Sequence, residues 1–490
     1  MSEISAPESE SIDVAIVGGG LSGLVTAVRA SMAGLRAIVF EKGAEERYLC
    51  ASRLTGGVFH VCMMDIRTDP QKLAAIISEE TGGFCSPELA DLVACNALRA
   101  VTWLTRAGVR FIRGPYPHLS FMLTPPNVVR VGAAWRGRGG DSALCVLEAQ
   151  LIKCGGQIRR GHRAKGLLSS PLGDCVGLEV ESAQGFSQVR SSAVVLADGG
   201  FQSSVPALSR YVTPAPEKVF QRNARRSFGD ALDMAEVFAP AIAGMDSFYG
   251  HVLSRLALHN EKLWPYPWLD DIVAMGIIVD GHGRRFCDEG LGGVAVANRI
   301  ARLTDPLSAT VICDAKMWAA NARSLVIPAN PYLQLLGGVV HQANDLTSLA
   351  QMADLPKDCL VRSVEAYNRS IASGSGLSLS PSRTSVGRTS ASPIAHGPFY
   401  AIPACAGITY TMGGPVIDSH ARMVSRAGHP IGGLYVVGAA SGGIEGGPRP
   451  GYVGGLVKAA VTGLAAAEHI VATRFSLRTM PQGISSAGQP

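Results

Sequence analysis

Apolar residues near the start of the chain form short runs separated by glycine. Residues 14–17 predict a buried strand, the alanine-rich segment after Gly23 predicts a helix, and residues 37–40 predict a second strand. A further strand-like run at residues 192–197 ends on glycines, and residues 229–238 resemble a helix. Strands that alternate with helices indicate an α/β fold built on a parallel sheet.

Three glycines join the first predicted strand to its helix. Gly18, Gly20 and Gly23 have G-x-G-x-x-G spacing. The first allows a tight turn, the second lets backbone amides approach a pyrophosphate, and the third lets helix and strand pack closely. The start of the helix, at Leu21 and Ser22, directs its positive dipole at the phosphates.

Glu41 ends the second predicted strand, about 20 residues after the glycines, where an acid can accept both hydroxyls of an adenosine ribose. The flanking strands and the acid distinguish this motif from a glycine-rich turn that only punctuates structure, so they predict a bound dinucleotide. The motif stands near the N-terminus, and no second motif is placed to hold NAD beside it. This favours FAD.

Composition narrows the class of protein. A chain of 490 residues with 47% hydrophobic content is expected to form two or more domains. A net charge of +5 without a long basic run argues against nucleic acid as a partner. The first dozen residues are polar and acidic, unlike a secretory signal, and no uncharged apolar run reaches about 18 residues, so we expect no membrane span.

The 11 cysteines are scattered and include no C-x-x-C pair. This argues against a zinc site, an iron-sulfur cluster or covalent haem, and we expect no metal. Reduced, mostly buried thiols are typical of a cytoplasmic protein.

Changes of texture along the chain predict its domains. We expect a dinucleotide-binding domain in two parts, residues 12–242 and 396–474, with a second domain at 243–395 where aromatic residues cluster with prolines. A Ser/Gly/Pro-rich loop at 370–398 is long enough for a surface excursion or linker, and the polar tail at 475–490 is expected to be disordered.

The sequence resembles the flavoprotein family that includes soluble fumarate reductases, urocanate reductase and the ketosteroid dehydrogenases, over roughly residues 12–472. The motifs that carry the resemblance, in order, are the glycine fingerprint, Glu41-Lys42, Thr55-Gly56-Gly57, Asp198-Gly199-Gly200, Gly229-Asp230, GRRFCDE at 283–289, PFYA at 398–401, Met412-Gly413-Gly414 and GLYVVGAASGG at 433–443. The resemblance implies a Rossmann-like FAD-binding domain of the glutathione-reductase type, with an inserted α+β cap domain and substrate held between cap and flavin.

The fingerprint and the resemblance together predict the residues that contact FAD. They are Gly18, Gly20, Leu21, Ser22, Gly23, Glu41, Lys42, Thr55, Gly56, Gly57, Ala197, Asp198, Gly199, Asp230, Gly438, Gly454 and Leu456. The last predicted helix begins after Gly454, so its free amides are expected to face a flavin carbonyl. The covalent histidyl-flavin pattern would place its histidine at Leu54 or Thr55, and His60 comes later, so we expect non-covalent FAD. The acid of a GAGE-type motif is replaced by Ala439.

Two residues fall where relatives of this family hold substrate. Arg449 stands where fumarate-reductase-like enzymes clamp a carboxylate, and a planar guanidinium binds such a group through two parallel hydrogen bonds. His251 falls at the position where the family has a substrate-binding histidine. The alternatives are a solvent-facing charge for Arg449 and a hydrogen-bonded core residue for His251.

The proton-relay positions of the fumarate reductases depart from the family pattern. They fall on Gly293, Leu269 and Ile272, and none of these can ionise. The resemblance instead places Tyr452 at or beside the position of the tyrosine base in the Δ4-ketosteroid dehydrogenases, and Tyr410 replaces a family histidine. We expect Arg449, three residues from Tyr452, to lower its pKa; the alternative for both tyrosines is a wall residue.

These observations predict a FAD-dependent dehydrogenase that forms a C=C bond next to the carbonyl of a cyclic ketone, keto acid or steroid-like substrate. Tyr452 would be the base, with Arg449, His251 and Tyr410 around the reacting carbons. An enoate or fumarate-type reductase running the reverse reaction is the alternative, and a flavin-binding protein without turnover is a third. The electron acceptor stays open among a quinone, an electron-transfer protein and O2.

Overall fold

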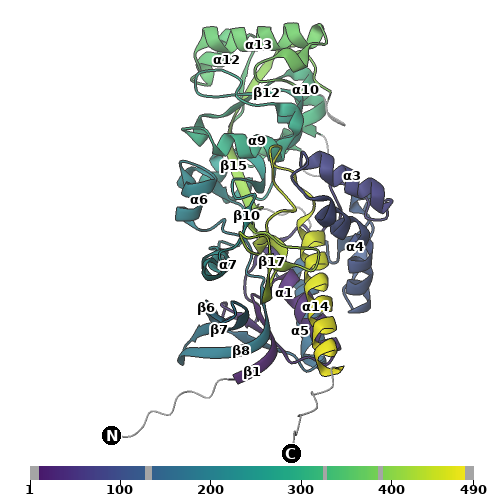
Figure 1. The fold of residues 1–490 in the computed structure, drawn as a ribbon. Coiled ribbons are helices and arrows are strands. Elements are labelled where there is room, and N and C mark those ends of the chain that lie inside the picture. The colour runs from purple at the N-terminus through teal and green to yellow at the C-terminus, as the bar shows by residue number, and fades with distance from the viewer. Residues whose placement is uncertain (1–9, 127–134, 324–327, 385–389, 480–490) are drawn as a thin grey trace, which may run out of the picture.

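The computed structural model describes residues 10–126, 135–323, 328–384 and 390–479 (Figure 1). Two sheets organise these residues, one near the chain termini and the other at the opposite end of the molecule. Each sheet has its own hydrophobic core.

The first sheet has eight strands and a parallel centre. Its strands in spatial order are β17 (Arg422–Val424), β18 (Pro430–Val436), β8 (Gly185–Leu196), β1 (Glu10–Val17), β2 (Ala37–Glu41) and β5 (Gln157–Arg160), with β7 (Cys175–Ser182) antiparallel to β8 and β6 (Arg163–Ser169) antiparallel to β7. Strands β18, β8, β1, β2 and β5 run parallel, and Val17 pairs with Leu196 and Phe40. The strands predicted at 14–17, 37–40 and 192–197 are therefore neighbours.

Helices of the first core cover this sheet and its edges. They are α1 (Leu21–Met32), α2 (Ala51–Leu54), α3 (Pro70–Glu80), α4 (Pro87–Arg106), α5 (Gly139–Lys153), α7 (Asp230–Ala235) and α14 (Gly455–Thr479). Helix α14 runs alongside α1 (Figure 1), and Thr26 of α1 donates to the carbonyl of Gly463 at 3.0 Å. The close approach needs glycine, because a Cβ at Gly463 would lie 2.7 Å from the Ser22 carbonyl oxygen.

Helix α14 is the one described helix long and apolar enough to cross a membrane by length and composition alone. In that segment, Gly455–Arg474, 61% of the most apolar window is buried inside the structure. A core helix has the same properties, so this is weak evidence for a membrane span.

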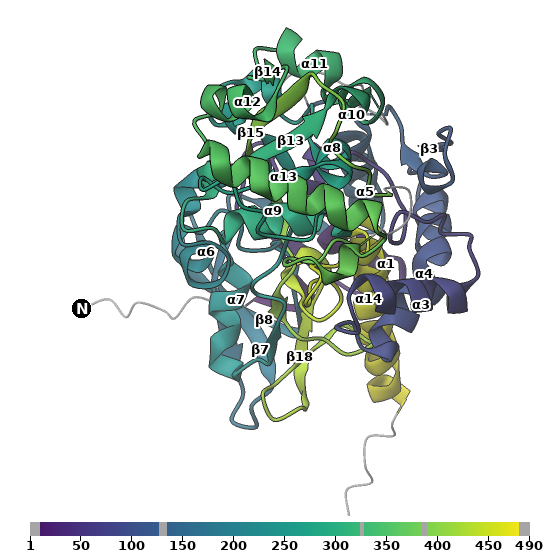
Figure 2. The same ribbon diagram turned by 90° about the horizontal axis from the view of Figure 1, so that it is seen from above.

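The second sheet has six strands. They are β9 (Phe220–Gln221), β11 (Phe248–Ser254), β12 (Ile277–Val279), β13 (Thr310–Asp314), β14 (His341–Ala343) and β15 (Phe399–Thr411). Around them lie α6 (Val205–Tyr211), α8 (Asp270–Met275), α9 (Gly293–Ala301), α10 (Ala315–Ala320), α11 (Ala329–Leu335), α12 (Leu346–Met352) and α13 (Lys357–Ala372), as Figure 2 shows. Two small ribbons, β3 (Phe111–Ile112) with β4 (Met122–Leu123) and β10 (Ile242–Ala243) with β16 (Gly414–Pro415), complete the strands described.

The second core extends beyond the boundaries expected at 243 and 395. It begins with Phe201 and ends with Ile408, because the whole of β15 pairs within the second sheet. The first core resumes at Ile417. Helix α7 interrupts this division, since Ala231 and Met234 pack in the first core.

Two irregular segments are more ordered than their composition suggests. Helix α13 continues to Ala372, and beyond it Arg383 is 2% exposed and donates to the carbonyl of Ala274. The amide of Thr384 donates to Asp288 at 2.9 Å, so this part of the loop is anchored to the second core. Helix α14 runs to Thr479, past the tail boundary expected at 475, and residues 480–490 lie outside the described part.

Candidate active site

A cavity of about 760 Å³ lies at the carboxyl ends of β1, β2 and β8 and reaches residues of the second sheet. Parallel strands deliver their carboxyl ends to one edge, which is where open α/β sheets bind ligands. Most residues predicted to contact the cofactor line it: Gly18, Gly20, Leu21, Ser22, Glu41, Lys42, Thr55, Gly56, Gly57, Ala197, Asp198, Gly199, Asp230 and Leu456.

The fingerprint glycines have the roles that their spacing predicts. Gly18 has φ +98°, and a Cβ there would lie 2.8 Å from the carbonyl oxygen of Ala197. A Cβ on Gly23 would collide with the Gly18 carbonyl, so this residue packs helix against strand behind the cavity. Gly20 faces the cavity, and its nearest neighbour would be Ser52 Oγ at 3.4 Å. The turn therefore leaves room for a bulky group beside the backbone.

Two carboxyl groups flank this turn, that of the buried Glu41 and that of the half-buried Asp198. Glu41 accepts the amide of Gly19 at 2.9 Å and that of Gly43 at 2.7 Å. Asp198 accepts the amide of Ala231 at 3.0 Å through Oδ2, while its buried Oδ1 has no hydrogen-bond partner in the described protein. Burial raises the pKa of Asp198 to about 7. An orphaned carboxyl oxygen in a cavity is suited to a hydroxyl donor from a bound group.

Two other predicted cofactor residues shape the cavity from behind. The amide of Gly438 donates to Thr462 Oγ1 at 2.9 Å. The amide of Gly454 donates to Glu445 Oε1 at 3.0 Å, so it does not face the cavity as a free donor. This contradicts the expectation for Gly454, because the buried Glu445 carboxylate takes the amide first.

Tyr452 stands in the cavity wall opposite the glycine turn. Its ring stacks on that of Tyr249, with centroids 4.0 Å apart and an interplanar angle of 18°. Its hydroxyl lies 3.5 Å from His60 Nε2. His60 Nδ1 accepts the amide of Met63 at 3.1 Å, so the neutral ring carries its proton on Nε2 and donates to Tyr452. The structure thus brings Tyr452 and His60 together.

The electrostatics of these two residues follow from burial. Burial lowers the pKa of His60 to about 4, with a smaller contribution from the nearby His118, so the imidazole is neutral. Burial raises the pKa of Tyr452 well above its ordinary value, and Tyr249 and Glu445 raise it further. The expected lowering by Arg449 is therefore wrong for this structure.

Arg449 does not reach the cavity. Gly446 and Gly451 exchange two backbone hydrogen bonds of 3.0 Å and close a hairpin whose tip carries Arg449. Its side chain is exposed and passes the backbone of Gly82. Two prolines within four residues between glycines are a turn pattern, and this turn directs the guanidinium away from Tyr452.

His251 lies behind the cavity wall and not in it. Its Nδ1 is 2.6 Å from Asp270 Oδ2, its Nε2 is 3.1 Å from the Tyr249 hydroxyl, and its ring stacks on Trp268 at 4.2 Å. Burial lowers its pKa, an effect that Asp270 opposes. His251 is therefore not among the residues that line the cavity, whereas Tyr249, in front of it, does line the cavity.

Tyr410 lines the cavity and is anchored from behind. Its hydroxyl lies 3.0 Å from both carboxylate oxygens of Glu445 and can only donate to them. Glu445 also accepts the amides of Val453 and Gly454 and lies 3.4 Å from Lys458. Tyr410 thus belongs to the buried network that fixes the backbone next to Tyr452.

Arg222 is a cavity residue that the sequence analysis missed. It follows β9, which pairs with β15, and its guanidinium lies 5.8 Å from the ring centroids of Tyr266 and Trp268. It donates to Thr409 Oγ1 at 2.8 Å and to the carbonyl of Pro265 at 3.4 Å, and among the described residues it has no carboxylate partner. Strand β9 has only two residues, so it shows no hydrophobic periodicity in the sequence. The aromatic residues beside Arg222 were visible in the sequence only as a cluster with prolines at 264–268.

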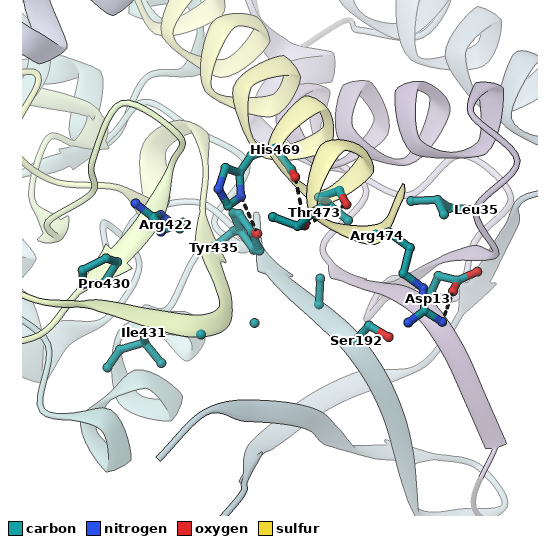
Figure 3. Close-up of a pocket in the computed structure, with 14 residues that line it drawn as sticks. Asp13, Leu35, Ser192, Arg422, Pro430, Ile431, Tyr435, His469, Thr473 and Arg474 are labelled. Carbon is teal, nitrogen blue, oxygen red and sulfur yellow. Dashed lines mark hydrogen bonds and ion pairs between the residues drawn. The ribbon is translucent and has the colours of Figure 1, made fainter. Parts of the chain in front are cut away.

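A smaller pocket of about 290 Å³ lies between β18 and the end of α14 (Figure 3). Four of its polar groups form two pairs, Arg474 with Asp13 at 3.0 Å and Tyr435 with His469 at 2.8 Å, and Arg422 pairs with Asp418. It holds none of the predicted site residues.

Residues 13–452 match the protein family described as FAD binding domain. The chain belongs to this family. The glycine turn, Glu41 and the orphaned oxygen of Asp198 fit FAD, whose flavin supplies a two-electron acceptor when bound. Among the described residues, no group of three His, Cys, Asp or Glu side chains is placed to hold a metal ion.

Known proteins of similar sequence act on C–C or C=C bonds. The chain is 26% identical to a fumarate reductase (cytochrome) of Shewanella frigidimarina, over 91% of this chain and 75% of that protein. It is 26% identical to 4-oxocyclohexanecarboxylate 2-dehydrogenase of Sinomonas cyclohexanicum, over 62% and 55%. The enzyme is thus a FAD-dependent oxidoreductase of the kind that acts on CH–CH groups.

The fold is similar to that of 3-ketosteroid Δ4-(5α)-dehydrogenase from Rhodococcus jostii RHA1 in complex with 4-androstene-3,17-dione. The TM-score is 0.70 over 96% of this chain and 99% of that one, with 19% identity. This likeness shows the fold alone.

Proposed function

We propose that this enzyme is a dehydrogenase that forms a C=C bond next to the carbonyl of a cyclic ketone or keto acid. The observation that carries the proposal is the position of Tyr452, whose hydroxyl faces the cavity between an imidazole donor and a second tyrosine. In the proposed reaction, Tyr452 takes a proton from the carbon next to the carbonyl. FAD, which the glycine turn, Glu41 and Asp198 would hold, would supply the acceptor for the hydride of the neighbouring carbon. The electron acceptor that then reoxidises the enzyme is left open.

Arg222 is the proposed holder of a substrate oxygen, in place of Arg449. A guanidinium offers paired donors to a carboxylate or an enolate-like oxygen, and this one has no acid partner in the described residues. Trp264, Tyr266 and Trp268 line the cavity beside it. An aromatic wall next to one cation suits a small ring that carries one anionic or carbonyl group.

Hydrogen bonds to the Tyr452 oxygen support its role as a base. His60 Nε2–H donates to it, and the backbone of Gly455 lowers the pKa of Tyr452; both stabilise the phenolate that must form. Three relay positions of the fumarate reductases are here Gly293, Leu269 and Ile272, with Leu269 and Ile272 buried. Proton delivery by the fumarate-reductase route therefore has no ionisable group in this chain.

A reductase working in the reverse direction is the second candidate. The raised pKa of Tyr452, caused first by burial, favours a neutral phenol, and a neutral phenol can give a proton to an enone. In a reversible reaction the residue that is the base in one direction is the acid in the other, so the two candidates differ only in the direction of the reaction.

Anaerobic mixing tests both. The FAD-loaded enzyme is mixed with 4-oxocyclohexanecarboxylate, cyclohexanone and a 3-ketosteroid, and flavin absorbance is followed. Bleaching supports the dehydrogenase. Reoxidation of chemically reduced enzyme by 2-cyclohexenone or fumarate, without bleaching by any ketone, favours the reductase. If neither occurs, the enzymatic proposal is wrong for these substrate classes.

A further inference from the structure

Tyr249, His251 and Asp270 form a row behind Tyr452. Tyr249 and His251 are two residues apart on β11, and Asp270 is the first residue of α8. The His251 ring bridges them, with 3.1 Å from Nε2 to the Tyr249 hydroxyl and 2.6 Å from Nδ1 to Asp270 Oδ2. A continuous row of exchangeable protons therefore leads from the cavity wall into the second sheet.

The hydrogen bonds of this row share one direction. A carboxylate only accepts, so His251 carries its proton on Nδ1, and its bare Nε2 accepts from Tyr249. The rings of Tyr249 and Tyr452 stack 4.0 Å apart. Tyr249 gives its one hydroxyl proton to His251, so toward the Tyr452 hydroxyl its oxygen can only accept. Each group thus donates to the next, from Tyr452 to Asp270.

Glycine at position 293 makes room for the outer end of the row. A Cβ on Gly293 would overlap the carboxylate of Asp270, so a side chain there would displace Asp270 from His251. Asp270 is held by a second bond, since its Oδ1 accepts the amide of Val252 at 2.8 Å. Its side chain is 18% exposed, against 7% for His251, so the row ends at solvent.

We propose that Tyr249, His251 and Asp270 are a proton relay that carries the proton of Tyr452 to solvent, an inference that rests on the proposed function. As Tyr452 takes a proton from substrate carbon, its own hydroxyl proton passes to Tyr249 Oη, the Tyr249 proton passes to His251 Nε2, and the Nδ1 proton passes to Asp270. One proton enters, one leaves, and no electrons move along the row. The relay lets a neutral phenol act as a base.

Other charged and titratable groups also face the row. Burial raises the pKa of Tyr249, and Arg222 lowers it; Tyr266 also faces Tyr249. For His251, burial lowers the pKa, Asp270 raises it, and Arg222 lowers it by a smaller amount. His60 faces Tyr452 from the opposite side. Substitutions that test the relay therefore leave Arg222 and His60 in place.

Asp270→Asn is the primary test, with Asp271→Asn as a control that removes the same charge from the same helix. The amide side chain of the Asp270→Asn variant keeps an oxygen that accepts the Val252 amide. Its NH2 group, however, donates to His251 Nδ1, so the imidazole proton moves to Nε2. Nε2 then cannot accept the hydroxyl proton of Tyr249. With 4-oxocyclohexanecarboxylate as the probe, we expect flavin bleaching to slow by about 100-fold to 10,000-fold at normal flavin content. Gly293→Ala should cause a similar loss while retaining every titratable group.

Two further readouts separate a relay from a structural role. Without substrate, a low-field imidazole N–H proton resonance from the Asp270–His251 bond should be present in the wild type and in Asp271→Asn, and absent in Asp270→Asn. The bleaching rate of the wild type should be flat above the pKa of His251, whereas in Asp270→Asn it should keep rising with pH, because Tyr452 must then ionise beforehand. Wild-type rate and pH profile in Asp270→Asn, or a resonance unchanged by the substitution, would overturn the relay alone. A wild type that reacts with none of the probes overturns the proposed function, and the relay with it.

Discussion

The rings of Tyr452 and Tyr249 lie parallel, 4.0 Å apart, although 203 residues of sequence separate them. Tyr452 follows the glycine hairpin of the first core, and Tyr249 belongs to β11 of the second sheet. The reacting end of the cavity therefore exists only where the two cores meet.

Tyr452→Phe removes one oxygen and keeps the ring that stacks on Tyr249. Folding and FAD content should be retained, while single-turnover flavin bleaching by a ketone substrate should slow by about 100-fold to 10,000-fold. Tyr410→Phe is the matched control, because its hydroxyl is donated to Glu445; it should cost about 1 to 3 kcal/mol of unfolding free energy and change the rate little. The reverse pattern would assign the base to Tyr410.

Arg222→Lys and Arg449→Lys separate the two candidate oxygen holders. An ammonium cannot present two parallel donors, so Arg222→Lys should weaken binding of a keto acid by about 10-fold to 100-fold, corresponding to about 1.5 to 3 kcal/mol. Arg449→Lys should bind like the wild type, because Arg449 is exposed at the hairpin tip. Equilibrium titration of flavin absorbance measures both, and a loss confined to Arg449→Lys would return that residue to the site.

Glu41→Ala should weaken FAD retention. The substitution leaves the amides of Gly19 and Gly43 without their acceptor and removes the expected partner of the ribose hydroxyls. Loss of one bond to a charged group corresponds to about 1.5 to 3 kcal/mol in the binding of FAD. Glu45→Ala removes the same charge four residues on, at an exposed position, and should retain FAD normally. Equal flavin loss on dilution in both variants would show that Glu41 has no special role.

Flavin should leave the protein on acid precipitation. Leu54 and Thr55 occupy the positions where a covalent histidine would be expected, and His60 Nδ1 already accepts the amide of Met63. The supernatant should be yellow and the pellet colourless. Colour that stays with the denatured chain would mean a covalent bond, and peptide mapping would then identify the residue.

His60 should make the protein less stable in mild acid. Burial holds the folded-state pKa at about 4, below the value of about 6.5 in an unfolded chain, so as the pH falls the unfolded chain binds the proton first. Between pH 7 and pH 5 the wild type should lose about 2 kcal/mol more than His60→Gln in urea unfolding. Parallel losses in the two proteins would mean that His60 is protonated in the folded state.

The cofactor half of the cavity could be predicted because its determinants are local. Gly18, Gly20, Gly23 and Glu41 lie within one strand-helix-strand segment, where backbone geometry alone fixes their roles. The same segment predicted the parallel pairing of β1 and β2, and the family match confirms FAD. Domain boundaries were harder, since β15 looks like any other strand and only its pairing assigns it to the second sheet.

The reacting half depended on tertiary structure. Sequence proximity favoured Arg449 as the partner of Tyr452, but the hairpin closed by Gly446 and Gly451 directs it to solvent. Arg222 follows β9, Tyr249 lies on β11 and Asp270 begins α8, so no spacing in the sequence records their approach to the cavity or its back wall. The sequence by itself determined the cofactor and the chemistry of Tyr452's side chain. Packing of two cores decided which charges, donors and acceptors surround it, because burial and distance, which set hydrogen bonds and pKa values, are properties of the folded chain.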